Sequence, residues 1–148
     1  MADIENPLVA FNFGLEIEGK LSGYFTKVTG IGSESEVVEH KIVNPDTGET
    51  IVQKIPGRLT WTNITLSRGV TTNVDVWEWR QMVVDGKVDD ARTNCSVIAY
   101  SQAAEEIARW NLENAWPSKV TGPEMDSSGQ NLMIEEMTIV HEGIARVS

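Results

Sequence analysis

Residues 110–119 read WNLENAWPSK, and residues 134–143 read IEEMTIVHEG. The first stretch is a tryptophan-rich strand that runs into a proline, and the second is a long strand that ends at a glycine. Because proline has no N–H to donate to a β-ladder, the strand predicted at residues 107–115 should end at Pro117 or meet a sheet edge there. Both stretches are typical of a β-protein whose strands align with neighbours. Neither stretch holds a set of nucleophile, base and acid.

Apolar and polar residues also alternate in earlier parts of the chain. In residues 11–18, the side chains of Phe11, Phe13, Leu15 and Ile17 share one face, which predicts a half-buried strand. A change of parity between Trp61 and Ile64 predicts a bulge near Asn63. Further strands are predicted at residues 24–29, 34–43, 50–55, 58–66, 94–100 and 132–147, the last with a bulge at 135–136.

The segment NPDTGE, residues 44–49, is a strong turn signal, because proline presets φ while Asn, Asp and Gly favour turn conformations. It predicts a hairpin or long loop that projects from the body and is broken after residue 55 by Pro56-Gly57. One helix is predicted over residues 73–84, capped by Thr72 or Asn73 and stopped by Gly86. Residues 87–94 are expected to form a polar connection, and residues 123–130 a loop.

These elements predict a single, mainly β domain over residues 1–148, an antiparallel barrel or sandwich with one flanking helix. The formal net charge of −10 disfavours direct binding to nucleic acid. Residues 1–7 do not resemble a secretory signal, and no apolar run approaches the roughly 20 residues of a membrane span. We therefore expect a soluble chain with no membrane anchor. The lone Cys95 is expected to be a small buried core residue.

The sequence offers no set of residues for catalysis. It contains no Gly-x-Ser-x-Gly elbow and no phosphate-binding glycine loop, and its two histidines, His40 and His141, lie in alternating strands. One cysteine and two distant histidines make a poor zinc shell. We therefore expect no catalytic residue, no metal and no cofactor. The alternatives are a monomeric β-sandwich carbohydrate-binding module that uses Trp61 or Trp110 and, more distantly, a small hydrolase with a pair of acids.

Several motifs in order resemble the tail tube protein family of contractile phage tails and phage-like contractile injection systems. The resemblance is carried by GRLTWTNITLSRGVT at residues 57–71, by Trp79, by NAWPSK at 114–119 with Gly122-Pro123, and by residues 135–136 and 141–143. The N-terminal residues 17–19, 23–25 and 28–30 also fit. The resemblance covers nearly the whole chain.

The resemblance implies a structural protein and not an enzyme. Tail tube proteins form a small β-barrel or sandwich with a flanking helix, and their hexameric rings share an inner β-barrel and stack into a hollow tube. A contractile sheath surrounds the tube and drives it through a target envelope. The implied partners are copies of the chain, a sheath protein, baseplate hub or spike proteins, a terminal cap and an effector as cargo. The implied setting is assembly in the bacterial cytoplasm, as part of a phage tail or of an extracellular or cell-anchored injection particle.

The resemblance and the strand pattern together suggest three groups of site residues. The N-terminal arm, residues 1–8, and a projecting loop, residues 44–50, are expected to reach a neighbouring subunit or ring. The subunit and ring interface is expected to include Asn44, Pro45, Asp46, Thr47, Gly48, Glu49, Trp116 and Pro117. The helix face toward the sheath or a neighbour is expected to present Asn73, Asp75, Glu78, Arg80 and Gln81. The candidates for the lumen are Glu16, Glu18, Glu34, Glu36, Thr60 and Thr62.

Overall fold

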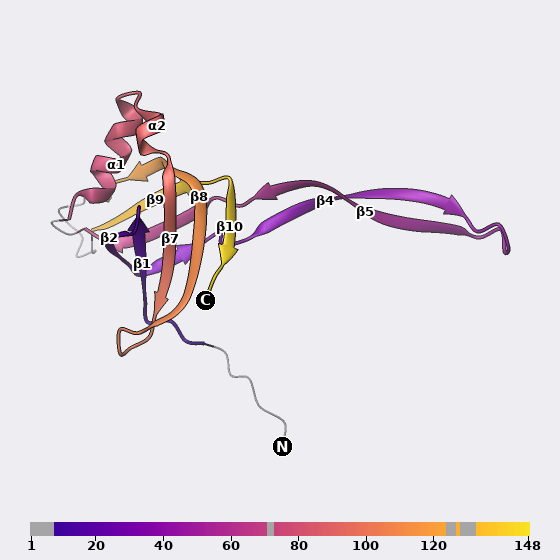
Figure 1. Cartoon of the computed structure of the whole chain (residues 1–148), viewed down its shortest axis with the longest axis horizontal. Helices are drawn as coiled ribbons and strands as arrows, with labels where there is room; N and C mark the ends of the chain where they lie inside the picture. Colours follow the sequence, from indigo (N-terminus) through magenta and orange to yellow (C-terminus); the bar gives the residue numbers. More distant parts are fainter. Residues whose placement is uncertain (1–7, 71–72, 124–126, 128–132) are drawn as a thin grey trace, which may run out of the picture.

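A computed structural model describes residues 8–70, 73–123, 127 and 133–148 of the chain. Within these ranges the chain forms ten strands and two short helices, and every strand pairing is antiparallel (Figure 1). The mainly β, antiparallel fold predicted from the alternation is therefore confirmed. Residues 1–7 of the predicted N-terminal arm, the helix-cap candidate Thr72 and most of the predicted loop 123–130 lie outside the described residues.

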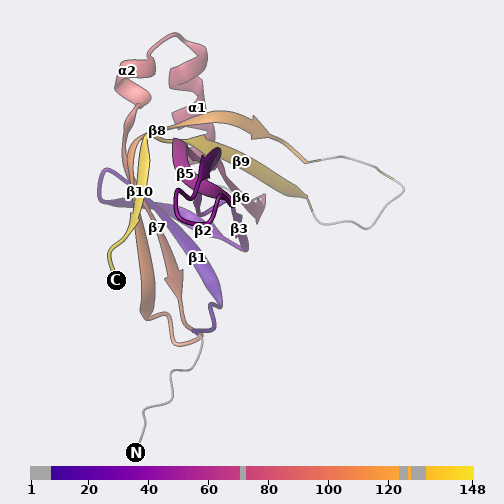
Figure 2. The same cartoon turned by 90° about the vertical axis from the view of Figure 1, so that its right-hand side faces the viewer.

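Eight of the strands form one sheet, which bends into two layers. The first layer has the order β2-β1-β7-β8-β10, and the second has the order β8-β9-β6-β3. The bounds are β1 Asn12–Ile17, β2 Lys20–Phe25, β3 Lys27–Thr29, β6 Ile64–Gly69, β7 Thr93–Tyr100, β8 Glu106–Thr121, β9 Ile134–Val140 and β10 Gly143–Arg146. Figures 1 and 2 show the two layers from perpendicular directions.

Strand β8 belongs to both layers because it bends at its centre. Residues up to Ala115 pair with β7 and β10, and residues from Trp116 onward pair with β9. Asn114, at the bend, has φ of 48°. The strand does not end at Pro117, but it does meet a sheet edge there: β7 and β10 pair with β8 only up to Ala115, so among the described strands β9 alone pairs with this part of β8. Pro117 stands opposite Ile139 of β9, and its carbonyl accepts from Arg80 on the outer side of this edge, where a missing N–H interrupts no ladder.

The core lies between the two layers. Leu15, Val97 and Leu112 point inward from the first layer, and Leu66, Met137 and Ile139 point inward from the second. Each of these six side chains is at most 1% exposed. Full burial of a large aliphatic side chain contributes roughly 1.5–3 kcal/mol, so this set is a major source of stability. Of the residues predicted on one buried face, Phe13, Leu15 and Ile17 contact the core, whereas Phe11 precedes β1 and is 67% exposed.

Strands β4, Ser33–Val43, and β5, Thr50–Trp61, pair only with each other in the described part of the chain. They form a long hairpin that leaves the body beyond β10 (Figure 1). Every residue of the two strands is exposed except Trp61, which is half-buried. The expected break at Pro56-Gly57 is wrong, because β5 continues through both residues with a register shift between Ser35 and Val37.

Helix α1, Asp75–Val84, begins two residues later than the helix predicted at 73–84 and ends at the same residue. It buries Val76 and Trp79 against the core. The polar connection predicted at residues 87–94 contains a one-turn helix, α2, Val88–Ala91. The indole nitrogen of Trp79 donates to the carbonyl of Ala91 at 2.7 Å, and this contact joins the two helices.

Three predicted strands are each two strands, because the chain changes partner between them. Residues 24–29 divide at Thr26, where β2 of the first layer passes into β3 of the second. Residues 58–66 divide at Thr62-Asn63, so the predicted bulge at Asn63 is a break between the hairpin and β6. Residues 132–147 divide at His141-Glu142, and not at the predicted bulge at 135–136.

Candidate functional site

The long hairpin presents two chemically different faces, which follow from its register. Val38 stands opposite Ile55, His40 opposite Gln53 and Ile42 opposite Ile51, so these six side chains form one face, here called the aliphatic face. The other side is here called the charged face; it carries Val37, Glu39, Lys41, Val43, Thr50, Val52, Lys54 and Pro56. Both faces lack a covering element among the described residues.

The tip of the hairpin holds the predicted interface residues 44–49 together. The N–H of Asp46 donates to Oδ1 of Asn44 at 2.9 Å, and the N–H of Gly48 donates to the carbonyl of Asn44 at 2.8 Å. Gly48 has φ of 74°, a left-handed conformation that glycine adopts without a steric cost. The turn is therefore a defined structure at the end of the hairpin, and its side chains are available for contact.

The other two predicted interface residues differ in accessibility. Trp116 is half-buried on β8, so part of its indole is open to solvent. The side chain of Pro117 is less than 2% exposed. Its carbonyl accepts a hydrogen bond from Nη1 of Arg80 at 3.1 Å. Pro117 thus holds α1 against β8 and offers no side-chain surface to another molecule.

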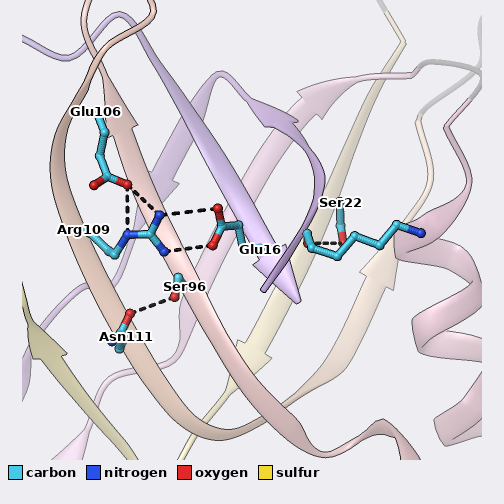
Figure 3. A network of polar contacts seen from close by, with 7 residues as sticks. Glu16, Ser22, Ser96, Glu106, Arg109 and Asn111 are labelled. Carbon is cyan, nitrogen blue, oxygen red and sulfur yellow. Dashed lines mark hydrogen bonds and ion pairs between the residues drawn. The ribbon is translucent and has the colours of Figure 1, made fainter. Parts of the chain in front are cut away.

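The first layer carries a polar network on the face opposite the core (Figure 3). Arg109 on β8 donates to Glu16 on β1 at 2.8 Å and to Glu106 at 2.6 Å. Hydrogen bonds to Glu16 and then to Glu106 raise the pKa of the Arg109 guanidinium above its usual value. Beside this network, Ser96 of β7 donates to Asn111 of β8 at 2.7 Å. The network joins three neighbouring strands on one hydrophilic surface, here called the polar face.

An aromatic strip lies next to this network on the same face. The ring of Tyr100 packs edge-on against Tyr24, with centroids 5.7 Å apart. The Tyr100 ring also lies over Gly14, where an added Cβ would be 2.7 Å from Cε2 of Tyr100. A side chain at position 14 would therefore displace the tyrosine. The strip covers Ile98, which is fully buried although it points away from the core.

The first layer ends in two edges whose outer sides are unpaired among the described residues. Strand β2 pairs with β1 alone, and β10 pairs with β8 alone. The edges lie at opposite ends of the same layer (Figure 1). Unpaired backbone N–H and C=O groups at such edges are templates for pairing with another strand. The layer is thus able to extend at both ends.

A buried ion pair holds α1 above the ends of β6 and β9. Nε of Arg68 lies 2.7 Å from Oε1 of Glu135, and both side chains are 4% exposed. The indole nitrogen of Trp77 donates to the other carboxylate oxygen at 2.7 Å. Nη2 of Arg68 donates to the carbonyl of Asn73 at 3.1 Å. Removing one partner of a buried ion pair typically costs about 3–5 kcal/mol, so this group fixes the position of the helix.

The residues predicted for the outer helix face have different roles. Nδ2 of Asn73 donates to the carbonyl of Ser22 at 3.0 Å, and Oδ1 of Asn73 accepts from the N–H of Asp75 at 2.9 Å. Asn73 and Arg80 therefore attach the helix to the body, and Asp75 is half-buried. Glu78 and Gln81 are exposed on the helix surface.

The six lumen candidates do not share one surface. Glu16 belongs to the polar face, and Glu18 follows it as an acceptor for the hydroxyl of Thr93 at 3.0 Å. Glu34 and Thr60 stand opposite each other near the base of the hairpin. Glu36 lies at the register shift of β4, and Thr62 follows β5. The sequence prediction missed Ser96, Glu106, Arg109 and Asn111, although all but Glu106 lie within predicted strands.

Two further properties of the described residues limit their chemistry. Their histidine, cysteine and carboxylate side chains form no cluster suited to hold a metal ion. None of the helices in the described ranges has the length and apolar character needed to cross a membrane.

The family model of T4-like virus tail tube protein gp19 matches residues 9–145 of the chain. The chain belongs to this tail tube family. It is therefore a structural tube protein and not an enzyme. The resemblance drawn from the sequence motifs is confirmed, and the carbohydrate-binding alternative has no support. No curated protein sequence matches the chain.

Solved structures share the fold of this tail tube protein at low sequence identity. The sheath–tube complex of the extracellular contractile injection system PVC contains a chain with TM-score 0.79 and 22% identity, covering 98% of this chain and 94% of that one. The cap of the anti-feeding prophage contains one with TM-score 0.80 and 21% identity, covering 100% and 95%. Hcp1 from Flavobacterium johnsoniae gives TM-score 0.54 and 15% identity, covering 92% and 94%.

Proposed function

We propose that this tail tube protein forms hexameric rings in which β10 of one copy pairs with β2 of the next. The observation that carries this proposal is the presence of two unpaired edges at opposite ends of the first layer. Pairing them head to tail uses two different surfaces, and such an interface closes into a ring when the rotation permits. Ring closure also removes exposed edges, which are an aggregation hazard in a free protomer.

The polar face of the first layer would then line the bore. The opposite face of this layer is filled by the core and covered by the second layer, so it is not available to an internal channel. The face that carries Glu16, Arg109 and Asn111 is hydrophilic and already has its hydrogen bonds made. Such a surface suits a water-filled channel. Of the six lumen candidates, Glu16 and Glu18 are the two that this geometry supports.

The hairpin supplies a second contact between copies. An isolated two-stranded hairpin is at best marginally stable in water, and this one has no cover within the described part of its own chain. We infer that it lies on a neighbouring copy and that its tip, residues 44–49, reaches the next subunit or ring. The N-terminal arm, residues 1–8, and the open part of Trp116 are further candidates for contacts between copies.

The proteins whose fold this chain shares suggest which other components surround the tube. Similar chains occur in structures described as a sheath–tube complex, a tube-terminating cap and a baseplate. We propose that this chain likewise assembles with a sheath protein, a baseplate hub or spike and a cap, and that the bore carries an effector. Assembly would take place in the bacterial cytoplasm, and the particle would be a phage tail or an injection device. Glu78 and Gln81 on α1 would face the sheath or a neighbouring copy.

Electron microscopy of concentrated protein tests the proposal. We expect rings and tubes of uniform diameter from the unaltered chain. Replacing residues 44–49 by a short Gly-Ser turn should leave a folded protomer, judged by circular dichroism, that forms no stacked tubes. An unaltered chain that stays monomeric at high concentration would contradict the ring. Normal tubes from the turn variant would contradict only the role of the hairpin tip.

A further inference from the structure

The direction of the long hairpin is set at its base. Within the described part of the chain, β4 and β5 have only each other as strand partners. The N–H of Thr62, just after β5, donates to the carbonyl of Gly32, just before β4, at 3.2 Å. Beyond this bond the hairpin extends away from the body (Figure 1). Contacts at the base therefore decide where the rest of the hairpin lies.

The length of the hairpin multiplies any change of angle at this base. Strand β4 has 11 residues, which span about 36 Å. A turn of about 10° at the base would move the tip by about 6 Å, which exceeds the spacing of about 4.8 Å between neighbouring strands. A tip that has to meet a fixed site therefore needs a base whose angle is held.

One side chain of the body is hydrogen-bonded to this base. His141 lies between β9 and β10, and its Nε2 is 3.1 Å from the carbonyl oxygen of Thr62. A carbonyl oxygen can only accept, so Nε2 carries the hydrogen. The same ring lies beside Trp61, with centroids 6.1 Å apart. Between residues that the structure describes, this is the one hydrogen bond that joins the base to the connection between β9 and β10.

Packing leaves part of the base uncovered. A cavity of about 440 Å³ is lined by Trp61 on the hairpin side and by Asn111, Glu113 and Ala145 on the side of the body. Nδ1 of His141 is buried and has no hydrogen-bond partner among the described residues. Burying a polar atom in this way costs free energy, so an apolar side chain would suit the site better if only packing mattered. The contact of Nε2 is what distinguishes histidine here.

The residue after His141 fixes the other end of the contact. Oε2 of Glu142 accepts from Nδ2 of Asn114 at 2.7 Å, and the N–H of Glu142 donates to the carbonyl of Glu113 at 2.9 Å. Asn114 lies at the bend of β8. Residues 141–142 therefore connect the base of the hairpin to the corner at which the two layers meet.

We propose that His141 is a positioning residue, which sets the direction of the hairpin relative to the body by holding the carbonyl of Thr62. Glu142 holds His141 to the bend of β8. The motif at residues 141–143 contributed to the family resemblance, and the proposed contacts between copies give it no other role. The consequence for assembly rests on the proposed function, because a hairpin that already has the correct direction loses less freedom when it binds a neighbouring copy.

Two substitutions of similar length separate the hydrogen bond from packing. Glutamine carries an N–H donor as many bonds from Cβ as Nε2 of histidine, whereas methionine has no donor. We expect His141→Gln to keep the direction of the hairpin and His141→Met to lose it. Both variants should unfold within about 5 °C of the unaltered chain, because only one partly exposed hydrogen bond is changed.

Distances between two spin labels on protomers give a direct readout of the hairpin angle. In a Cys95→Ala background, the labels are attached to Val43→Cys at the outer end of β4 and to Asn111→Cys on β8. We expect the distance distribution to be at least about twice as wide in His141→Met as with His141 in place, and unchanged in His141→Gln. Equal widths in all three chains would overturn the inference.

Tube assembly provides a second readout. We expect the protein concentration needed for tubes to rise at least about fivefold in His141→Met and less than about twofold in His141→Gln, because only copies with a correctly directed hairpin can bind. Equal increases in the two variants would contradict the role of the donor. If the unaltered chain forms no rings, the proposed function fails, and the spin-label distances still decide the role of His141. If tubes form and the widths are equal, the inference alone is wrong.

Discussion

The thiol of Cys95 has low reactivity in the folded protomer because β7 places its side chain in the core. Its side chain points into the core with 3% exposure. Burial, and to a smaller extent the charge of Glu18, raises the pKa of the thiol from 9.0 to about 12. The thiolate is the reactive form of cysteine, so the folded protein holds this residue in its inert form. The expectation of a small buried core residue, made from its apolar surroundings in the sequence, agrees with this environment.

The raised pKa of Cys95 predicts a loss of stability in alkali. The thiol ionises more easily in the unfolded chain, so its contribution is complete below about pH 9 and is lost as the pH rises toward 12. At pH 10 the loss of unfolding free energy should be roughly 1 kcal/mol. Urea unfolding at pH 8 and pH 10 measures it, with Cys95→Ala as the control. The decrease should be larger in the unaltered chain by about this amount, and equal decreases would contradict the assignment.

The polar face shows where residue-level prediction from the sequence ends. Alternation in residues 11–18 correctly assigns Glu16 to the side opposite the core. Its partner Arg109 is 93 positions away, and no local pattern states which residue of β8 stands near which residue of β1. Register is set by the packing of whole strands, and a slip of one residue would exchange the two faces. The carboxylate was therefore predictable, and the ion pair was not.

At the level of elements, alternation identifies strands but does not show where one strand changes its partner. Thr26 and Thr62-Asn63 mark such changes, and the residues on both sides continue a β-like pattern. A strand that crosses a corner keeps its backbone conformation, so the sequence gives little sign of the crossing. Pro117 was partly informative: it does not end β8, but it lies where β8 pairs with β9 alone and forms a sheet edge.

The connection from β3 to the hairpin depends on one glycine and not on its neighbour. Gly30 has φ of 88°, and an added Cβ would collide with the backbone carbonyl oxygen of Asn63. At Gly32 an added Cβ would meet no atom within 4 Å. We expect Gly30→Ala to lower the free energy of unfolding by at least about 2 kcal/mol and Gly32→Ala by less than about 0.5 kcal/mol. Chemical denaturation of both variants measures this, and similar losses would show that Gly30 has no special role.

At the scale of the whole molecule, the order of motifs carried information that periodicity did not. Alternation and turn signals predicted a mainly β chain with a helix and a hairpin. They placed its strands at residues 34–43 and 50–55 but could not state that both faces are exposed, because the apolar residues on these faces look like those of any half-buried strand. The tail tube resemblance, carried by residues such as 57–71 and 114–119, explains that exposure through the proposed contacts between copies.

The assignment of the polar face to the bore predicts a pattern of chemical protection. In a Cys95→Ala background, a cysteine replacing exposed Asn111 lies on the polar face, and a cysteine replacing exposed Glu78 lies on α1. Both should react with a bulky maleimide polymer in free protomers. In assembled tubes we expect the Asn111→Cys thiol to react at least about tenfold more slowly, with the Glu78→Cys thiol little changed. Equal rates at the two positions in tubes would contradict the orientation.

The bend of β8 has a mechanical consequence. One uninterrupted run of peptide bonds, Glu106 to Thr121, crosses from one layer to the other. A force that pulls the two layers apart therefore strains covalent backbone at this corner, besides the side chains packed between them. Separating the two layers requires the first part of β8 to lose its pairing with β7 and β10, or the last part to lose its pairing with β9. A subunit whose two layers share one continuous strand is suited to bearing mechanical load.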